Sequence, residues 1–202
     1  MKRVLFIIGL IGLFNAAYSA EKPNTSKNRL PVIDTTQNPC HQFKKLKTAQ
    51  QYFESANNRT KGCWPNDSLT TVIAAKEYSL AVKLNPKYWQ ARRNYARQLI
   101  VLKQYDLAIA QLNEAIKLTG GKQDFYLYAM RGEVFYEKGQ YEKAIIDYDV
   151  AMKYSGNIDY LLLIKAKAQW KLGQKEEACI NYKKSVEMTP HLAEKKEFIL
   201  CD

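Results

Sequence analysis

The sequence predicts an all-α protein built from repeated pairs of antiparallel helices. Two observations support this fold class. The first is a nearly constant interval between small residues, since Ala74, Ala108, Ala144 and Ala178 follow one another at almost equal steps. The second is that apolar residues recur at helical spacing around each alanine, with glycine or proline between the apolar stretches. Regular helices with regular stops indicate a stacked, repetitive architecture.

The clearest unit begins at Phe125. Counted from that residue, small and aromatic residues stand at positions eight, eleven, twenty, twenty-four and twenty-seven, namely Gly132, Phe135, Ala144, Tyr148 and Ala151. This spacing resembles the tetratricopeptide repeat, in which small residues let two helices approach closely and aromatic residues fill the gaps. The resemblance covers residues 88–190 and implies three full repeats, preceded by an N-terminal half-repeat and followed by a C-terminal capping helix.

We expect the three repeats to consist of consecutive helix pairs. Their ranges are 88–103 with 105–118, 124–138 with 141–154, and 158–172 with 175–188. A final short helix is expected within 191–202, because the last inner face of a solenoid needs a cap. The interval from Ala108 to Ala144 is slightly longer than the other two, and its extra length falls in 119–122, a connector that tolerates insertion.

Residues 40–87 are expected to form a divergent cap at the start of the array. The spacing of Phe43, Leu46 and Phe53 predicts a helix over 41–55, followed by a loop over 57–67. A helix from about Ser68 to Leu84 has the features of a second repeat helix. The first helix of that repeat is expected to be missing, because Pro65 stands where its aromatic residue should be.

The N-terminal residues predict export. Lys2 and Arg3 precede an apolar stretch, and Ala17-Tyr18-Ser19 offers a cleavage site, so residues 1–19 are expected to be a signal peptide. Residues 20–39 are expected to be a flexible linker. The alternative of a membrane anchor is disfavoured, because the apolar stretch is shorter than the roughly 20 residues that cross a bilayer. We therefore expect a periplasmic or secreted protein.

Charge and cysteine content fit this location. The whole chain has a formal net charge of +11, which bears on its partners more than on its fold. Four cysteines in an oxidising compartment indicate disulfides, and three pairings are possible. We expect Cys40 to pair with Cys63 and Cys179 with Cys201, because the two ends of a repeat array do not meet.

The residues that would support catalysis are scarce. The chain has two histidines, neither of which lies in a metal-binding or nucleophile motif, and it has no glycine-rich phosphate loop. We therefore expect neither an enzyme nor a cofactor or metal site. Nucleic acid is not expected as a partner of an exported chain.

A partner protein is expected in the concave groove between the first helices of the repeats. In the family this groove is lined by positions two, five, nine, twelve and thirteen. The resemblance assigns partner binding to aromatic and basic residues, namely Arg93, Arg97, Tyr126, Tyr136, Tyr160, Lys167, Trp170 and Lys171. Tyr, Trp and Arg are enriched at binding hot spots.

Trp170 is expected to be the main anchor, facing the groove. An alternative is that these residues form an ordinary solvated face. Two functional classes remain open. One is a non-catalytic scaffold or adaptor that holds an acidic or extended segment of another protein. The other is an immunity or inhibitor protein that neutralises a cognate exported toxin.

Overall fold

The structure is a computed structural model. It describes residues 40, 42–63, 67–121, 124–155, 158–192 and 201. Within these ranges the chain forms eight α-helices and one short 3-10 helix. The helices are α1 (Ala49–Gly62), α2 (Ser68–Leu84), α3 (Trp89–Val101), α4 (Tyr105–Leu118), α5 (Phe125–Glu137), α6 (Tyr141–Tyr154), α7 (Asp159–Lys171), α8 (Lys175–Met188) and η3 (Pro190–Leu192).

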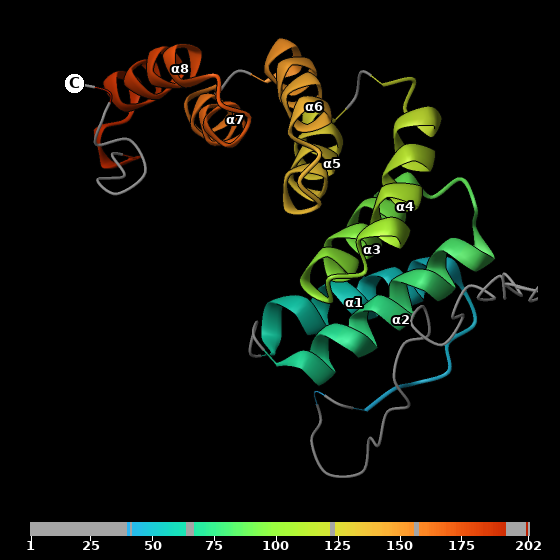
Figure 1. Cartoon of the computed structure of the whole chain (residues 1–202). Coiled ribbons are helices and arrows are strands. Elements are labelled where there is room, and N and C mark those ends of the chain that lie inside the picture. Colours follow the sequence, from blue (N-terminus) through green and yellow to red (C-terminus); the bar gives the residue numbers. More distant parts are fainter. Residues whose placement is uncertain are drawn as a thin grey trace, which may run out of the picture.

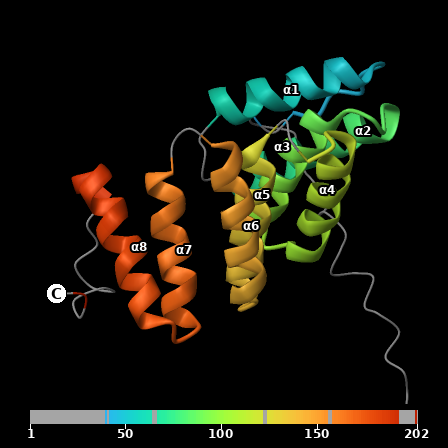
Figure 2. The same ribbon diagram turned by 90° about the horizontal axis from the view of Figure 1, so that it is seen from above.

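Consecutive helices pack as pairs, and the pairs stack in chain order. Helices α1 and α2, α3 and α4, α5 and α6, and α7 and α8 form the pairs, and the second helix of each pair also contacts the first helix of the next. Figure 1 shows this succession from α1 to α8, and Figure 2 shows α6, α7 and α8 side by side, with α5 partly behind α6. The predicted all-α repeat fold is therefore confirmed.

The marker residues of the repeat make the contacts within each pair. Ala74, Ala108, Ala144 and Ala178 are all fully buried. Gly132 of α5 lies directly against the ring of Tyr148 on α6, so closely that a Cβ at Gly132 would be 2.6 Å from the Tyr148 Cε1 atom. Glycine therefore allows these two helices to approach around a buried tyrosine.

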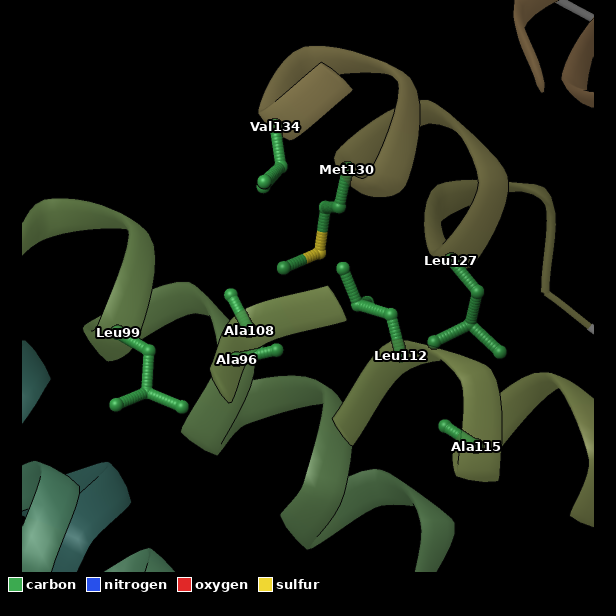
Figure 3. Close-up of a cluster of buried hydrophobic side chains, with 8 residues drawn as sticks. All are labelled: Ala96, Leu99, Ala108, Leu112, Ala115, Leu127, Met130 and Val134. Carbon is green, nitrogen blue, oxygen red and sulfur yellow. The ribbon is translucent and has the colours of Figure 1, made fainter. Parts of the chain in front are cut away.

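Neighbouring pairs share an apolar core. Figure 3 shows the cluster between α3, α4 and α5, in which Met130 of α5 points toward the side chains of the preceding pair. The buried members are Ala96, Leu99, Ala108, Leu112, Ala115, Leu127, Met130 and Val134. This shared core joins the pairs into one body and positions the first helices along one face.

The turn between the helices of a pair is also repeated. Gly139 and Gly173 have φ values of 71° and 86°, and Lys103 occupies the equivalent turn with a φ of 55°. In each turn the N–H of the following glutamine donates a hydrogen bond to a carbonyl of the preceding helix. One example is the 2.8 Å bond from the Gln140 N–H to the Phe135 carbonyl. Lys103 thus adopts a left-handed conformation that favours glycine.

The N-terminal helix lies further along the chain than expected. The expected helix over 41–55 and loop over 57–67 are wrong, because α1 begins at Ala49 and continues to Gly62. Thr48 caps α1 through its side chain, in a capping box with Gln51. The first helix that seemed to be missing is therefore present, and α1 and α2 form a helix pair.

Phe43 and Leu46, which precede α1, are apolar because they pack against α1 and not because they form a helix. Phe43 and Leu46 are non-helical, yet they pack against the cluster that contains Tyr52. The Leu46 N–H donates to the Tyr52 hydroxyl at 2.9 Å, and the Arg59 guanidinium donates to the carbonyls of Cys40 and Gln42. We call residue 40 and residues 42–48 the strap. The strap contacts α1 without forming a helix, so the helix-like spacing of Phe43 and Leu46 reflects partial burial and not a helix.

Both expected disulfides are present. Cys40 is bonded to Cys63 and Cys179 to Cys201, so all four cysteines are oxidised. The first bond fixes the start of the strap to the end of α1. The second fixes residue 201 to α8, where Cys201 is buried in a cluster with Leu163 and Ala178.

Several expectations lie outside the described residues. These are the signal peptide at 1–19, the linker at 20–39, and the capping helix over most of its range, because the description resumes only at residue 201 after Leu192. At the start of 191–202 the structure shows the 3-10 helix Pro190–Leu192. None of the described helices combines the length and the apolar character needed to cross a membrane.

Candidate functional site

A pocket of about 530 Å³ opens between α3, α5 and α7, and we call it the tyrosine pocket. It lies on the face formed by the first helices of three consecutive pairs, which the shared cores hold side by side. Its lining residues are Arg97, Ile100, Val101, Phe125, Tyr126, Ala129, Met130, Glu133, Tyr136, Glu137, Tyr148, Tyr160, Leu161, Ile164 and Lys167. The pocket is therefore rich in aromatic side chains and contains charges of both signs.

Three exposed apolar side chains line this pocket. Val101 is 60% exposed, Tyr126 52% and Tyr160 58%. Tyr126 and Tyr160 occupy the same position in successive units. Asp124 caps α5 and accepts a hydrogen bond from the Tyr126 N–H at 2.9 Å, which fixes the start of the helix that carries this ring. Large exposed aromatic residues gathered in a concavity are typical of a binding surface.

The charges of the tyrosine pocket are arranged by helix. Arg97 comes from α3, Glu133 and Glu137 come from α5, and Lys167 comes from α7. Burial among the pocket atoms raises the pKa of Glu133, and the nearby Glu137 raises it further, against a smaller opposing effect of Arg97. The tyrosine pocket thus has two carboxylates on its central helix and one basic side chain on each of the two flanking helices.

A second pocket, of about 520 Å³, continues the same face toward the N-terminus, and we call it the basic pocket. It is lined by Phe53, Asn57, Thr60, Lys61, Cys63, Thr70, Thr71, Tyr78, Arg93, Asn94, Arg97, Gln98 and Val101. Arg97 and Val101 line both pockets, so the two are adjacent. Among its described lining residues the basic pocket has three cationic side chains and no carboxylate.

The structure brings together five of the eight predicted partner-binding residues. These are Arg97, Tyr126, Tyr136, Tyr160 and Lys167, all in the tyrosine pocket. Arg93 lies in the basic pocket, where its guanidinium donates to the Asp124 carboxylate at 2.6 Å and lies near the Trp89 ring. Arg93 therefore links α3 to the start of α5. That a partner binds these residues stays a prediction.

The expectation that Trp170 faces the groove is wrong. The Trp170 ring packs against the cluster of Leu163, Ala166, Ala178 and Cys201, and lines neither pocket. Tyr136, at the equivalent position of α5, lines the tyrosine pocket, whereas Trp170 packs against a cluster that contains the disulfide-linked Cys201. Lys171 is exposed and lines neither pocket.

Several pocket residues were not among the predicted partner-binding residues. Lys61 and Thr60 were assigned to a loop, because α1 was placed too early in the chain. Tyr148, from a second helix, reaches the tyrosine pocket behind Gly132. Ala56 could have revealed the position of α1, because it packs with Tyr78 much as Gly132 packs with Tyr148. The separation in sequence from the small residue to the tyrosine is longer in the first case than in the second.

The described residues offer little to a metal or to acid–base chemistry. No group of three His, Cys, Asp or Glu side chains that could hold a metal ion occurs in the part of the chain that the structure covers. His191 lies exposed in η3. The geometry of the pockets instead offers aromatic surface, hydrogen-bonding groups and fixed charges.

This arrangement defines the class of protein as a helical-hairpin solenoid with a concave pocketed face. The tetratricopeptide repeat profile matches residues 160–192. The chain is also 39% identical over 82 residues to BBSome complex member BBS4 of Bos taurus, and this match covers 41% of the chain and 15% of that much longer relative. Together with the stacked helix pairs, these matches show a tetratricopeptide repeat at residues 160–192 and a fold of the tetratricopeptide-repeat type over the stacked pairs.

Solved structures show the same fold. The structure of MamA protein has a TM-score of 0.60 and 20% identity, covering 69% of this chain and 72% of that one. MamA from Desulfovibrio magneticus RS-1 has a TM-score of 0.61 and 16% identity, covering 72% and 78%. YrrB, described as "a TPR protein with an unusual peptide-binding site", has a TM-score of 0.59 and 19% identity, covering 70% and 69%.

Proposed function

We propose that this protein is an exported, non-catalytic scaffold whose concave face holds an extended segment of a partner protein. The observation that carries the proposal is that three exposed apolar side chains, Val101, Tyr126 and Tyr160, line one pocket between α3, α5 and α7. Solvent exposure of such side chains is unfavourable, and a partner that covers them gains hydrophobic free energy. The groove is long enough to hold several residues, because a second pocket adjoins the first.

The fold supports a protein or peptide as the ligand. Tetratricopeptide repeats generally serve protein–protein interaction, and the similarly folded YrrB is described as having a peptide-binding site. Tyrosine rings add large contact area with little loss of side-chain entropy, and their hydroxyls can bond to a peptide backbone. An extended peptide can use these groups without a secondary structure of its own.

The N-terminal residues and the disulfides support export. Lys2 and Arg3 precede an apolar stretch with a cleavage site, and all four cysteines are in disulfides, which persist in oxidising compartments. Fractionation of cells that make the protein tests this location. We expect a shortened, oxidised form in the periplasmic or secreted fraction, and a full-length, reduced form in the cytoplasm would contradict export.

The binding proposal is tested with a library of linear peptides selected on the oxidised protein. Selected peptides should lose about tenfold or more in affinity when Tyr126 and Tyr160 are both changed to alanine, because hot-spot aromatic residues contribute about 2 kcal/mol or more. Tyr154→Ala is the matched control, since Tyr154 is 46% exposed and lines neither pocket. Equal binding by all three proteins would overturn the proposal.

A further inference from the structure

The concave face has an uneven distribution of charge along its length. The basic pocket contains Lys61, Arg93 and Arg97 and no carboxylate among its described lining residues. The adjacent tyrosine pocket places two carboxylates, Glu133 and Glu137, on its central helix α5. A ligand that crosses both pockets therefore meets three basic side chains first, and next an aromatic-rich pocket whose central helix carries two carboxylates between Arg97 and Lys167 of the flanking helices.

The tyrosine pocket fits a cationic group. Glu133 and Glu137 are one helical turn apart, so their charges repel each other. In the described part of the chain no ion pair connects either of them to a basic residue. The rings of Tyr126, Tyr136 and Tyr160 line the same pocket, and the faces of aromatic rings attract ammonium and guanidinium groups. Burial and the neighbouring Glu137 raise the pKa of Glu133, and Arg97 lowers it by a smaller amount.

The basic pocket fits a carboxylate. Arg93 is already paired with Asp124, so the positive charge available to a ligand comes mainly from Lys61 and Arg97. Both side chains are exposed at the pocket, and they come from α1 and α3. Their attraction steers a carboxylate to this end of the face. The expectation of an acidic or extended partner segment stays a prediction, and the basic pocket is the place on this face that suits an acidic residue.

We propose that the groove binds an extended partner segment in one fixed direction, with an acidic residue in the basic pocket and a lysine or arginine beside Glu133 and Glu137. This inference rests on the proposed function and specifies its ligand. Arg97, which lines both pockets, separates the two charged sites. Because the charges of the two sites are opposite, the reversed direction places like charges together, and the groove selects against it.

The test begins with peptides selected from a random linear library on the oxidised, full protein. We expect the selected sequences to share an Asp or Glu at a constant distance from a Lys or Arg. Fluorescence anisotropy then compares one selected peptide with a synthetic peptide in which the acidic and basic residues are exchanged. The exchanged peptide should bind at least tenfold more weakly, although its composition is identical.

Variants of the protein assign each charge to its pocket. The double variant Glu133→Gln/Glu137→Gln should weaken the selected peptide about tenfold or more, and should have little effect on a peptide whose basic residue is replaced by norleucine. Lys61→Gln should weaken only peptides that keep the acidic residue. Glu142→Gln and Lys153→Gln are the matched controls, because both residues are exposed and line neither pocket.

The outcomes separate this inference from the proposed function. Peptides that need Tyr126 and Tyr160 but bind equally in either charge order would overturn the directional inference and leave the groove function intact. Selected peptides that ignore both tyrosines would overturn the proposed function itself. Sedimentation that shows a dimer which peptides cannot dissociate would assign the groove to a second copy of the chain, and would also contradict the inference.

Discussion

The N-terminal pair α1–α2 and the central pair α5–α6 make the same contact between a small residue and a tyrosine, at different separations in the sequence. In each pair a small residue of the first helix packs with a buried tyrosine of the second, Ala56 with Tyr78 and Gly132 with Tyr148. Tyr78 stands 22 residues after Ala56, whereas Tyr148 stands 16 residues after Gly132, and most of this difference lies within the helices. The helix contact is therefore retained while the sequence separation of its two residues varies.

A polar contact is repeated beside the small-residue contact. In both pairs an arginine of the first helix binds a buried carboxylate of the second with two hydrogen bonds, Arg59 to Glu77 and Arg131 to Asp147. The other two pairs use an amide in place of the ion pair, with Arg92 donating to Gln111 and Asn181 donating to Gln169. The comparison indicates that a polar contact between the two helices accompanies the apolar core in each of these pairs.

The two ion pairs differ in burial, and this difference predicts the largest effect. The Arg59 and Glu77 side chains are 8% and 0% exposed, whereas those of Arg131 and Asp147 are 21% and 4% exposed. Glu77→Gln should lower the free energy of unfolding by about 3 to 5 kcal/mol, because Arg59 is left buried without its counter-ion. Asp147→Asn should cost less, since water reaches Arg131. Chemical denaturation measures the unfolding free energy of both variants. Equal losses would show that the difference in burial does not affect how much the two ion pairs contribute.

The disulfide at the N-terminal pair predicts the next effect. Replacing Cys40 and Cys63 together by serine should lower stability by about 3 kcal/mol, the chain-entropy value for a sequence separation of 23. The loss should be local, because repeat units are stabilised mainly by their neighbours. Hydrogen exchange should show faster opening of α1 than of α5. If hydrogen exchange became faster to the same extent in all helices, the disulfide would stabilise the whole array.

Gly132 predicts a smaller effect in the central pair. A Cβ at this position would lie 2.6 Å from the Tyr148 ring, which is 2% exposed and has little room to move. Gly132→Ala should therefore lower stability by about 1 to 3 kcal/mol through overpacking, despite the better helix propensity of alanine. Thermal unfolding measures this change. The reciprocal variant Ala56→Gly tests whether α1 and α2 need their small side chain, and it should cost about 1 kcal/mol.

The smallest predicted effect is a gain. Lys103 adopts a φ of 55° in a turn where the two later pairs have Gly139 and Gly173. Lys103→Gly should raise stability by about 0.5 to 1 kcal/mol, because glycine adopts this conformation without the steric cost of a side chain. A melting temperature that stays the same or falls would show that the Lys103 side chain contributes more than its backbone strain removes.

The period of small residues made most of the fold predictable. Ala74, Ala108, Ala144 and Ala178 were identified from their spacing alone, and each is fully buried. Helix α1 was misplaced because Ala56 and Tyr78 are further apart in the sequence than Gly132 and Tyr148, so the period of the later pairs does not locate Ala56. The spacing of Phe43 and Leu46 then favoured a helix where the chain forms a strap.

The candidate site was predictable in part, for physical reasons that differ by residue. Tyr126 and Tyr160 line the pocket because successive units repeat the same geometry at the period of the sequence. The prediction for Trp170 was wrong because Cys201, which the disulfide joins to α8, lies in the cluster against which this ring packs, and spacing does not reveal that contact. Arg93 was placed correctly on α3, but its contact with Asp124 depends on how two units stack, which spacing does not reveal.

An NMR titration of the isotope-labelled protein with a library-selected peptide tests most directly whether the concave face is the binding surface. We predict that the amide signals of Arg97, Tyr126 and Tyr160 shift on binding, because these residues line the tyrosine pocket. Ile146 and Ile180, which are 61% and 66% exposed on α6 and α8, should not respond. Shifts centred on Ile146 and Ile180, with the tyrosine pocket unchanged, would contradict binding in the groove.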